Sequence, residues 1–400
     1  MILQEQISFV MNNQGGDYEN KSNITIRTSL SNIPMSDSFA TIITGVRRCG
    51  KSTLLQQLLH NKFPKAIFFN FEDIRLTGFE AIDFMRFHNE IVKREIEVLF
   101  LDEIQLVSGW EVYVNQLLRE GYKVFVTGSN ASMLSKELGT NLTGRHLSVE
   151  LFPFDYNEYL TLKQLPNSAE SAKQYIFDGG FPEYLKTGNG MILTQLLNDI
   201  ITRDIAVRYS VKNVNSLKAL VLYLLSNVGK PVSANKLKGL FGIKSVATIT
   251  EFFSYMQDAY LLQFLPQFSY SIKAQIRNPK KVYAIDTGMV NEISSSFSMD
   301  LGRKLENVVY LHLRRIYKEL FFYKNKGECD FIIKEKGNIT QAIQVCYKLT
   351  DLNLEREVNG LLEALKEFNL KEGFIITMNQ QDEYNIDSKK ITVIPLNNYL

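Results

Sequence analysis

Three short apolar runs in the first third of the chain have the character of buried β-strands. They cover residues 40–44, 98–101 and 123–127, and they are rich in β-branched or aromatic side chains. Between the first two runs, residues 54–59 repeat leucine with the spacing of a helix. We therefore predict an α/β fold whose core, within residues 1–150, contains a parallel sheet. Residues 1–35 show little periodicity and are expected to form an amino-terminal arm or a first helix.

The rest of the chain divides into three further predicted domains. Residues 151–210 begin with aromatic and proline residues and end in a helical run, which predicts a small helical segment. Residues 211–295 contain three helix patterns followed by an extended stretch, the order of a winged helix-turn-helix. Residues 296–400 combine two helix patterns with four strand patterns and predict a second α/β domain.

Length and composition are those of a globular protein and exclude several classes. The 400 residues favour two to four domains at roughly 100–200 residues each. No apolar run approaches the ~18 residues of a membrane helix, and the amino-terminal residues do not have the pattern of a signal peptide. Cys49, Cys329 and Cys346 are widely spaced without a CxxC pair, which argues against zinc or a disulfide framework. A reducing cytoplasm fits best.

The strand at 40–44 leads into a segment that matches GxxxxGK[ST] at every fixed position. Its glycines let backbone N–H groups face phosphate oxygens, and the following helix adds its positive amino-terminal dipole. Lys51 supplies a point charge to the β- and γ-phosphates of ATP, and Ser52 offers a hydroxyl to Mg²⁺. The competing interpretation is a chance glycine-rich turn. The predicted ATP-binding residues are Gly45, Val46, Arg47, Arg48, Cys49, Gly50, Lys51, Ser52 and Thr53.

Two acids end the second apolar run. A buried strand that terminates in Asp102 would place its carboxylate beside the phosphate loop, where it orders the Mg²⁺ shell. Glu103 would then orient or deprotonate the attacking water as a general base. The alternative is a strand that ends in solvated acids.

A polar residue after the third run, Ser129 or Asn130, is expected to contact the attacking water or the γ-phosphate. We assign this catalytic role to Asn130. The alternative is a helix N-cap, a position that Ser and Asn both favour.

These segments, with those that follow, resemble the AAA+ class of P-loop ATPases. The resemblance is nearest to a prokaryotic group of predicted ATPases with a C-terminal domain of unknown function. It is carried by residues 44–55, 100–105, 127–130, 142–146, 151–155, 179–183, 203–204, 284–288 and 305–307. The resemblance implies a helical lid in residues 151–210 and an arginine that completes the site, in the same subunit or a neighbouring one. Arg145 is our candidate for that catalytic arginine, and the alternative is a surface arginine or loop anchor.

Charge is concentrated in the predicted winged helix. Residues 211–282 hold ten basic and two acidic residues, a balance of +8 in a chain of net +2. Such a basic footprint on this fold predicts contact with duplex DNA, and Lys244, Ser245 and Thr248 begin the recognition helix. The alternative is a protein-interaction or purely structural module with a solvated basic face.

The last domain resembles the core of the PD-(D/E)XK nucleases. Asp330 matches the first metal-binding acid and Glu306 the helix acid, but the acid-x-lysine pair is replaced by Gln344 and Cys346. Lys348 is a candidate for a migrated lysine, although it does not restore the missing carboxylate. We therefore expect a degenerate domain without nuclease activity.

Together these features predict a Mg²⁺-dependent ATPase that couples ATP to action on DNA or on a protein partner, with homo-oligomerisation left open. The alternatives are an ATP-sensing DNA-binding regulator with little turnover and a small-molecule kinase. The pair Asp102 and Glu103 favours turnover, and no acceptor pocket for a kinase is evident from the sequence.

Overall fold

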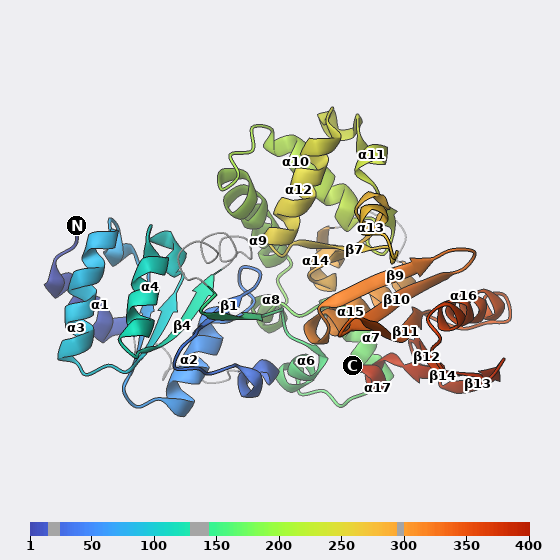
Figure 1. Cartoon of the computed structure of the whole chain (residues 1–400), viewed down its shortest axis with the longest axis horizontal. Coiled ribbons are helices and arrows are strands. Elements are labelled where there is room, and N and C mark those ends of the chain that lie inside the picture. Colours follow the sequence, from blue (N-terminus) through green and yellow to red (C-terminus); the bar gives the residue numbers. More distant parts are fainter. Residues whose placement is uncertain (15–24, 129–143, 294–299) are drawn as a thin grey trace. The chain divides into compact units, whose positions relative to one another are not determined.

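The computed structural model describes residues 1–14, 25–128, 144–293 and 300–400 (Figure 1). The chain forms two compact units, Met1–Phe152 and Pro153–Leu400. The division falls close to the predicted end of the first domain at residue 150.

The first unit contains a five-stranded sheet with the order β2-β3-β4-β1-β5. All of its neighbouring strands run parallel, so the prediction of a parallel α/β core is confirmed. Because parallel strands end at the same edge, residues 45, 103 and 128 are brought to one side of the sheet. The strands are β1 (Ala40–Thr44), β2 (Ala66–Asn70), β3 (Val98–Asp102), β4 (Lys123–Gly128) and β5 (His146–Glu150).

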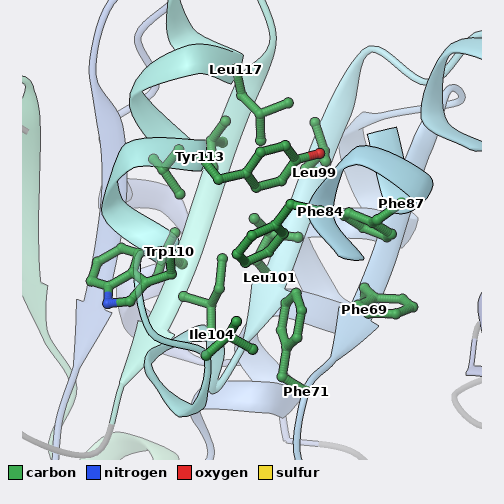
Figure 2. Packing of buried hydrophobic residues seen from close by; sticks show 14 of the residues in the cluster. Phe69, Phe71, Phe84, Phe87, Leu99, Leu101, Ile104, Trp110, Tyr113 and Leu117 are labelled. Atoms are coloured by element: carbon green, nitrogen blue, oxygen red, sulfur yellow. The ribbon is translucent and has the colours of Figure 1, made fainter. Parts of the chain in front are cut away.

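Helices cover both faces of this sheet. On one face, the side chains of α1 (Gln4–Gln14), α3 (Phe84–Lys93) and α4 (Trp110–Arg119) share a buried cluster with the strands. Figure 2 shows Trp110 and Tyr113 of α4 packed with Phe84 of α3 over the strands. The rings of Phe84 and Tyr113 stack with centroids 4.3 Å apart. This cluster holds β3 and β4 in register and so fixes the ends from which the polar residues project.

The other face is built from the alternate residues of the same strands, as the two-residue period of a strand requires. Phe100 of β3 stacks on Phe125 of β4 with ring centroids 4.7 Å apart. Phe63, which follows α2 (Lys51–Lys62), packs against both rings at 5.8 and 5.9 Å. The helix that begins at the phosphate-binding motif is thereby anchored to the sheet.

The second unit begins with helices, in the segment predicted to be a lid. Here α7 and α9 pack against α14 (Thr287–Ile293), which lies far along the chain. Their action as a lid over a nucleotide stays a prediction. The helices are α6 (Tyr156–Lys163), α7 (Ala169–Asp178), α8 (Pro182–Thr187) and α9 (Met191–Asp199), followed by a π-helical segment, Ile200–Val207.

Three helices and a small antiparallel sheet follow, with the strand order β6-β8-β7. The second of the three helices predicted within residues 211–295 is short, because Gly239 and Phe241, which follow it, adopt positive φ angles of 87° and 55° that a continuing helix cannot contain. A short helix, α13, also stands between the last two strands. The elements are α10 (Val214–Leu225), β6 (Pro231–Val232), α11 (Ala234–Leu237), α12 (Val246–Asp258), β7 (Leu262–Pro266), α13 (Ile272–Arg277) and β8 (Lys280–Ala284).

The carboxy-terminal region is built on a six-stranded mixed sheet with the order β13-β14-β12-β11-β10-β9. The sequence analysis found four of these strands and missed β13 and β14. The elements are α15 (Leu301–Ile316), β9 (Glu319–Lys324), β10 (Glu328–Glu335), β11 (Asn338–Val345), α16 (Leu354–Glu367), β12 (Glu372–Thr377), β13 (Asp382–Ile386), β14 (Lys389–Pro395) and α17 (Leu396–Tyr399).

Candidate active site

The loop between β1 and α2 requires both of its glycines. Gly45 has a φ of 152°, and a Cβ at this position would lie 2.1 Å from the carbonyl oxygen of Leu151. Gly50 caps α2 in the left-handed region with a φ of 102°. A Cβ there would lie 3.2 Å from Nη1 of Arg27. At Gly45 the loop thus approaches the Leu151 backbone more closely than any other residue type permits, and at Gly50 the left-handed backbone favours glycine.

Lys51 and Ser52 open α2 at the carboxyl edge of the sheet. Lys51 is only 5% exposed, and its Nζ donates to the carbonyl oxygens of Gly45 (3.0 Å) and Val46 (3.1 Å). Ser52 is exposed. The ammonium therefore lies over the loop, at the amino terminus of a helix, where an anionic ligand is favoured.

The other predicted loop residues differ in what they present to a ligand. Val46 and Cys49 are fully buried, so only their backbone groups can face a phosphate. Arg47 and Thr53 are half-buried, and Arg48 is exposed with a left-handed φ of 62°.

Asp102 ends β3 beside this loop with a side chain only 1% exposed. Its Oδ1 accepts a hydrogen bond from Thr127 Oγ1 (2.5 Å), whereas Oδ2 is buried and lacks a hydrogen-bond partner within the described part of the chain. Burial raises the pKa of Asp102 to about 6, although the Thr127 and Ser52 hydroxyls lower it. A buried carboxylate oxygen without a partner, next to a serine hydroxyl, fits the oxygen ligands that Mg²⁺ requires.

Glu103 follows at the same edge of the sheet. Its backbone is left-handed, with a φ of 53°, which turns the chain away from the direction of β3. The backbone N–H donates to Thr127 Oγ1 (3.1 Å), and the half-buried carboxylate accepts a hydrogen bond from Gln105 Nε2. The structure therefore brings Glu103 together with Asp102, Lys51 and Ser52 at one edge.

Thr127, near the end of β4, contacts both acidic residues, and the sequence analysis gave it no role of its own. Its fully buried hydroxyl donates to the Asp102 carboxylate and accepts from the backbone N–H of Glu103, so one side chain links the two residues. A threonine near the end of the strand beside the acidic strand was the available signal. Ser129 and Asn130, which we predicted for the γ-phosphate contact, lie outside the described residues.

Arg145 lies at the opposite edge of the sheet from the loop. Its carbonyl accepts from the N–H of Ala40, the first residue of β1 (3.1 Å). Because β5 runs parallel to β1, five residues of strand separate Arg145 from Gly45, about 16 Å at 3.3 Å per residue. An arginine side chain is much shorter, so Arg145 does not reach the loop of its own chain in this structure. A role in a neighbouring subunit stays a prediction.

Comparisons with known proteins identify the family of the chain. A family model described as an AAA domain matches residues 37–160. Two further models, each described only as a domain of unknown function, match residues 169–300 and 301–399. The uncharacterized protein MJ1544 of Methanocaldococcus jannaschii is 36% identical over 393 residues, covering 88% of this chain and 86% of that protein. The chain belongs to this family of AAA+ P-loop ATPases.

A more distant relative and a solved structure assign no further activity to the chain. An uncharacterized protein of Haemophilus influenzae is 28% identical over 378 residues, covering 89% of this chain and 93% of that protein. Among solved structures, AMPPCP-bound DnaA from Aquifex aeolicus is 15% identical, covers 57% of this chain and 84% of that chain, and has a TM-score of 0.27. That TM-score is too low to support an inference about this AAA+ chain. Within the described ranges, we find no helix with the length and apolar character needed to span a membrane.

The second unit of this AAA+ chain contains a buried charge cluster where the nuclease-like acids were predicted. Glu306 of α15 and Asp330 of β10 do come together, but the ammonium of Lys281 lies between them. Its Nζ is 3.0 Å from Glu306, 2.7 Å from Asp330 and 2.9 Å from Glu328. Burial acts to lower the pKa of Lys281, but Asp330, Glu306 and Glu328 raise it well above the ordinary value, so the ammonium stays charged.

This cluster corrects two expectations from the sequence. Lys348, our candidate for a lysine beside the acids, is exposed and lies beyond the end of β11, so it is not part of this cluster. Lys281 is 2% exposed and bound by three carboxylates, so it does not belong to the basic surface of residues 211–282. Gln344 accepts from the N–H of Asp330 and donates to Glu357, which is a structural role.

The later motifs of the family also have structural roles around β8. Asp286 is buried and accepts hydrogen bonds from the N–H groups of Gly180 (2.6 Å) and Met289 (2.8 Å). A Cβ on Gly180 would lie 2.3 Å from the Phe154 carbonyl oxygen. Asn307 pairs through its amide with both the N–H and the carbonyl of Ala284. These residues fasten the strand that carries Lys281 to the helices on either side.

We predict that Thr127→Val lowers ATP turnover roughly tenfold to hundredfold while leaving nucleotide affinity nearly unchanged. The substitution keeps the shape but removes the hydroxyl that holds both acids, and hydrogen bonds to charged groups contribute about 1.5–3 kcal/mol. Steady-state kinetics and equilibrium nucleotide binding test this. Thr41→Val is the matched control, because that buried hydroxyl bonds the Pro34 carbonyl instead. Equal turnover in the two variants would contradict the role of Thr127.

We also predict that Lys281→Met lowers the free energy of unfolding of the second unit by about 3–5 kcal/mol. The substitution removes the cation from three carboxylates, of which Glu306 and Asp330 stay buried. Urea unfolding followed by a probe in the second unit measures this. Lys280→Met, at the preceding residue of β8, is the control and should cost far less. Similar costs for the two substitutions would show that the cluster contributes little.

Proposed function

We propose that this chain hydrolyses ATP in a Mg²⁺-dependent reaction at the carboxyl edge of the first sheet. The observation that carries the proposal is the hydroxyl of Thr127, which ties Asp102 and Glu103 together beside Lys51 and Ser52. A pair of solvated acids at a strand end would need no such buried support. The family membership of the chain supports the same activity.

Each residue has a distinct task in this proposal. On nucleotide binding, Lys51 would exchange the carbonyls of Gly45 and Val46 for the β- and γ-phosphates. Ser52 and Asp102 would hold Mg²⁺, which supplies positive charge to the phosphate oxygens. Glu103 would orient the attacking water and accept its proton, a role that general bases support by roughly 10²–10⁴-fold in rate.

We predict that Lys51→Ala abolishes measurable Mg²⁺–ATP binding and that Glu103→Gln keeps binding but loses most turnover. The first variant removes the charge that meets the phosphates, and the second removes the base while the Asp102 carboxylate remains. Binding of a fluorescent ATP analogue and release of inorganic phosphate are the two measurements.

Glu72→Gln is the matched control, because Glu72 is an exposed acid that follows β2 at the same edge. It should bind and turn over ATP like the wild type. Unchanged nucleotide affinity in Lys51→Ala would reject the site. Turnover that survives in Glu103→Gln would reject the base. A wild type that binds ATP without measurable turnover would favour the ATP-sensing regulator.

We further propose that the chain couples its nucleotide state to action on duplex DNA. The contact with DNA would be made by the basic module, residues 211–282. With Lys281 excluded, nine basic residues remain against two acidic ones. Seven of the nine are exposed: Lys212, Lys218, Lys236, Lys238, Lys244, Lys273 and Arg277. Ser245 is exposed at the start of α12, and α13 carries Lys273 and Arg277 between β7 and β8, the place of a wing. A protein partner is the alternative occupant of this face.

We predict salt-sensitive duplex binding without metal-dependent cleavage. Replacing Lys236, Lys244 and Lys273 with alanine should weaken binding, and each lost phosphate contact should reduce the slope of log affinity against log salt by about 0.9. Fluorescence anisotropy with short duplexes measures this. Lys318→Ala with Lys326→Ala is the control, since both lysines are exposed in the second unit outside the module.

Nicking of supercoiled plasmid in Mg²⁺ or Mn²⁺ is the parallel assay, and no cleavage is expected because Lys281 occupies the carboxylate cluster. Absence of duplex binding at low salt would assign the module to protein contacts. Cleavage that disappears in Asp330→Ala would contradict the expectation that the carboxy-terminal domain lacks nuclease activity.

A further inference from the structure

Arg27 is a buried arginine between the phosphate loop and the end of the first unit. It lies in the segment before β1 and is 5% exposed. Its Nη1 donates to the carbonyl oxygen of Cys49 (2.6 Å), and its Nη2 donates to that of Phe152 (2.7 Å). These partners lie 22 and 125 residues away along the chain. The sequence analysis gave Arg27 no role.

The backbone at Arg27 is fixed to the helix that starts at the loop. Gln57 of α2, which is 1% exposed, accepts from the N–H of Arg27 (3.3 Å) and donates to the carbonyl of Thr25 (2.9 Å). Arg27 is therefore held at two places. Gln57 of α2 binds its backbone, and the carbonyls of Cys49 and Phe152 bind its guanidinium. Such pre-organised geometry distinguishes arginine from lysine.

The loop and the strand before it also contact Leu151, the residue before Phe152, directly. The N–H of Leu151 donates to the carbonyl of Thr44 (2.7 Å), and the Cys49 thiol lies 3.4 Å from the Leu151 carbonyl. Gly45 approaches that carbonyl so closely that a Cβ has no room. Phe152 is the last residue of the first unit, and Pro153 begins the second. The loop is thus bound to the two residues that lead out of the first unit.

Holding the Cys49 carbonyl also orients the next N–H group. In a planar trans peptide the carbonyl and the N–H point in opposite directions. With the Cys49 carbonyl directed at Arg27, the N–H of Gly50 must point away from Arg27. Backbone N–H groups of this loop are the phosphate donors that the motif supplies.

We propose that Arg27 is a positioning residue that presents Gly50 to the phosphates and transmits the nucleotide state of the loop to Phe152. It acts through the loop and touches no reacting atom. The inference rests on the proposed binding of ATP at the loop, and it adds the route by which that binding reaches the connection to the second unit.

The test compares Arg27→Lys with Arg94→Lys. A lysine ammonium keeps the charge but is a compact donor on a flexible stem, so it cannot reproduce the fork between Cys49 and Phe152. Arg94 is the matched control, because it joins α3 to α1 through Ser8 and Asn12, away from the loop. Two quantities are measured: affinity for a fluorescent ATP analogue, and the nucleotide-dependent change in amide hydrogen exchange of a peptide spanning residues 149–156.

We expect the wild type and Arg94→Lys to show slower exchange in residues 149–156 when nucleotide is bound. Arg27→Lys should bind nucleotide roughly tenfold to hundredfold more weakly, the size expected for hydrogen bonds from a charged donor. At saturating nucleotide it should still lack the exchange change. Arg27→Ala with millimolar guanidinium should recover part of both properties, which also keeps the test valid if the lysine variant folds poorly.

An exchange change in Arg27→Lys equal to that of the wild type would overturn the transmission. Equal nucleotide affinity would overturn the positioning of Gly50. A wild type that binds nucleotide without any exchange change in residues 149–156 would overturn the inference while leaving the ATP site intact. A wild type that does not bind nucleotide would instead reject the proposed function.

Discussion

The common edge of the parallel sheet is the constraint on which the first unit depends. Lys51, Asp102 and Thr127 are far apart along the chain, and parallel strands are what bring their segments to one side. The buried cluster beneath them fixes the strands in register, so one hydroxyl can serve two acids. Packing of the core and geometry of the site are therefore parts of one arrangement.

The second unit depends on a different interaction, a buried ammonium among carboxylates. Lys281 comes from β8, whereas Glu306 and Asp330 come from α15 and β10, so the cluster joins the basic module to the carboxy-terminal sheet. A divalent cation could neutralise such carboxylates, but the chain supplies its own cation. Because the ammonium is covalently part of β8, the cluster keeps its cation only while β8 stays in place. The acids that a nuclease would use for metal thus serve to hold this unit together.

The sequence revealed those features that depend on short segments. The loop glycines, Lys51 and the pair Asp102 and Glu103 follow directly from local pattern, and the parallel sheet follows from the apolar runs. Thr127 was missed because its role depends on the neighbouring strand. Arg27 was missed because its partners are distant in sequence. The lysine count misassigned Lys281, since composition carries no information about burial. Strand β13 was missed because it is short, mostly polar and largely exposed. Strand β14 alternates buried Ile391 and Val393 with more exposed residues, a strand pattern that the sequence analysis overlooked.

Two of the buried cations among the described residues, Arg27 and Lys281, have comparable tasks. Each is almost completely buried, and each joins elements that are distant in sequence. Arg27 donates to two neutral carbonyls. Breaking a hydrogen bond to a neutral acceptor costs less free energy than separating a buried charge pair, so the Arg27 contacts tolerate small shifts of the loop more readily. Lys281 is bound by three charges, and separating it would leave uncompensated carboxylates. A nucleotide-dependent change that reaches Phe152 would therefore meet a second unit whose basic module and carboxy-terminal sheet are held together by the costlier interaction.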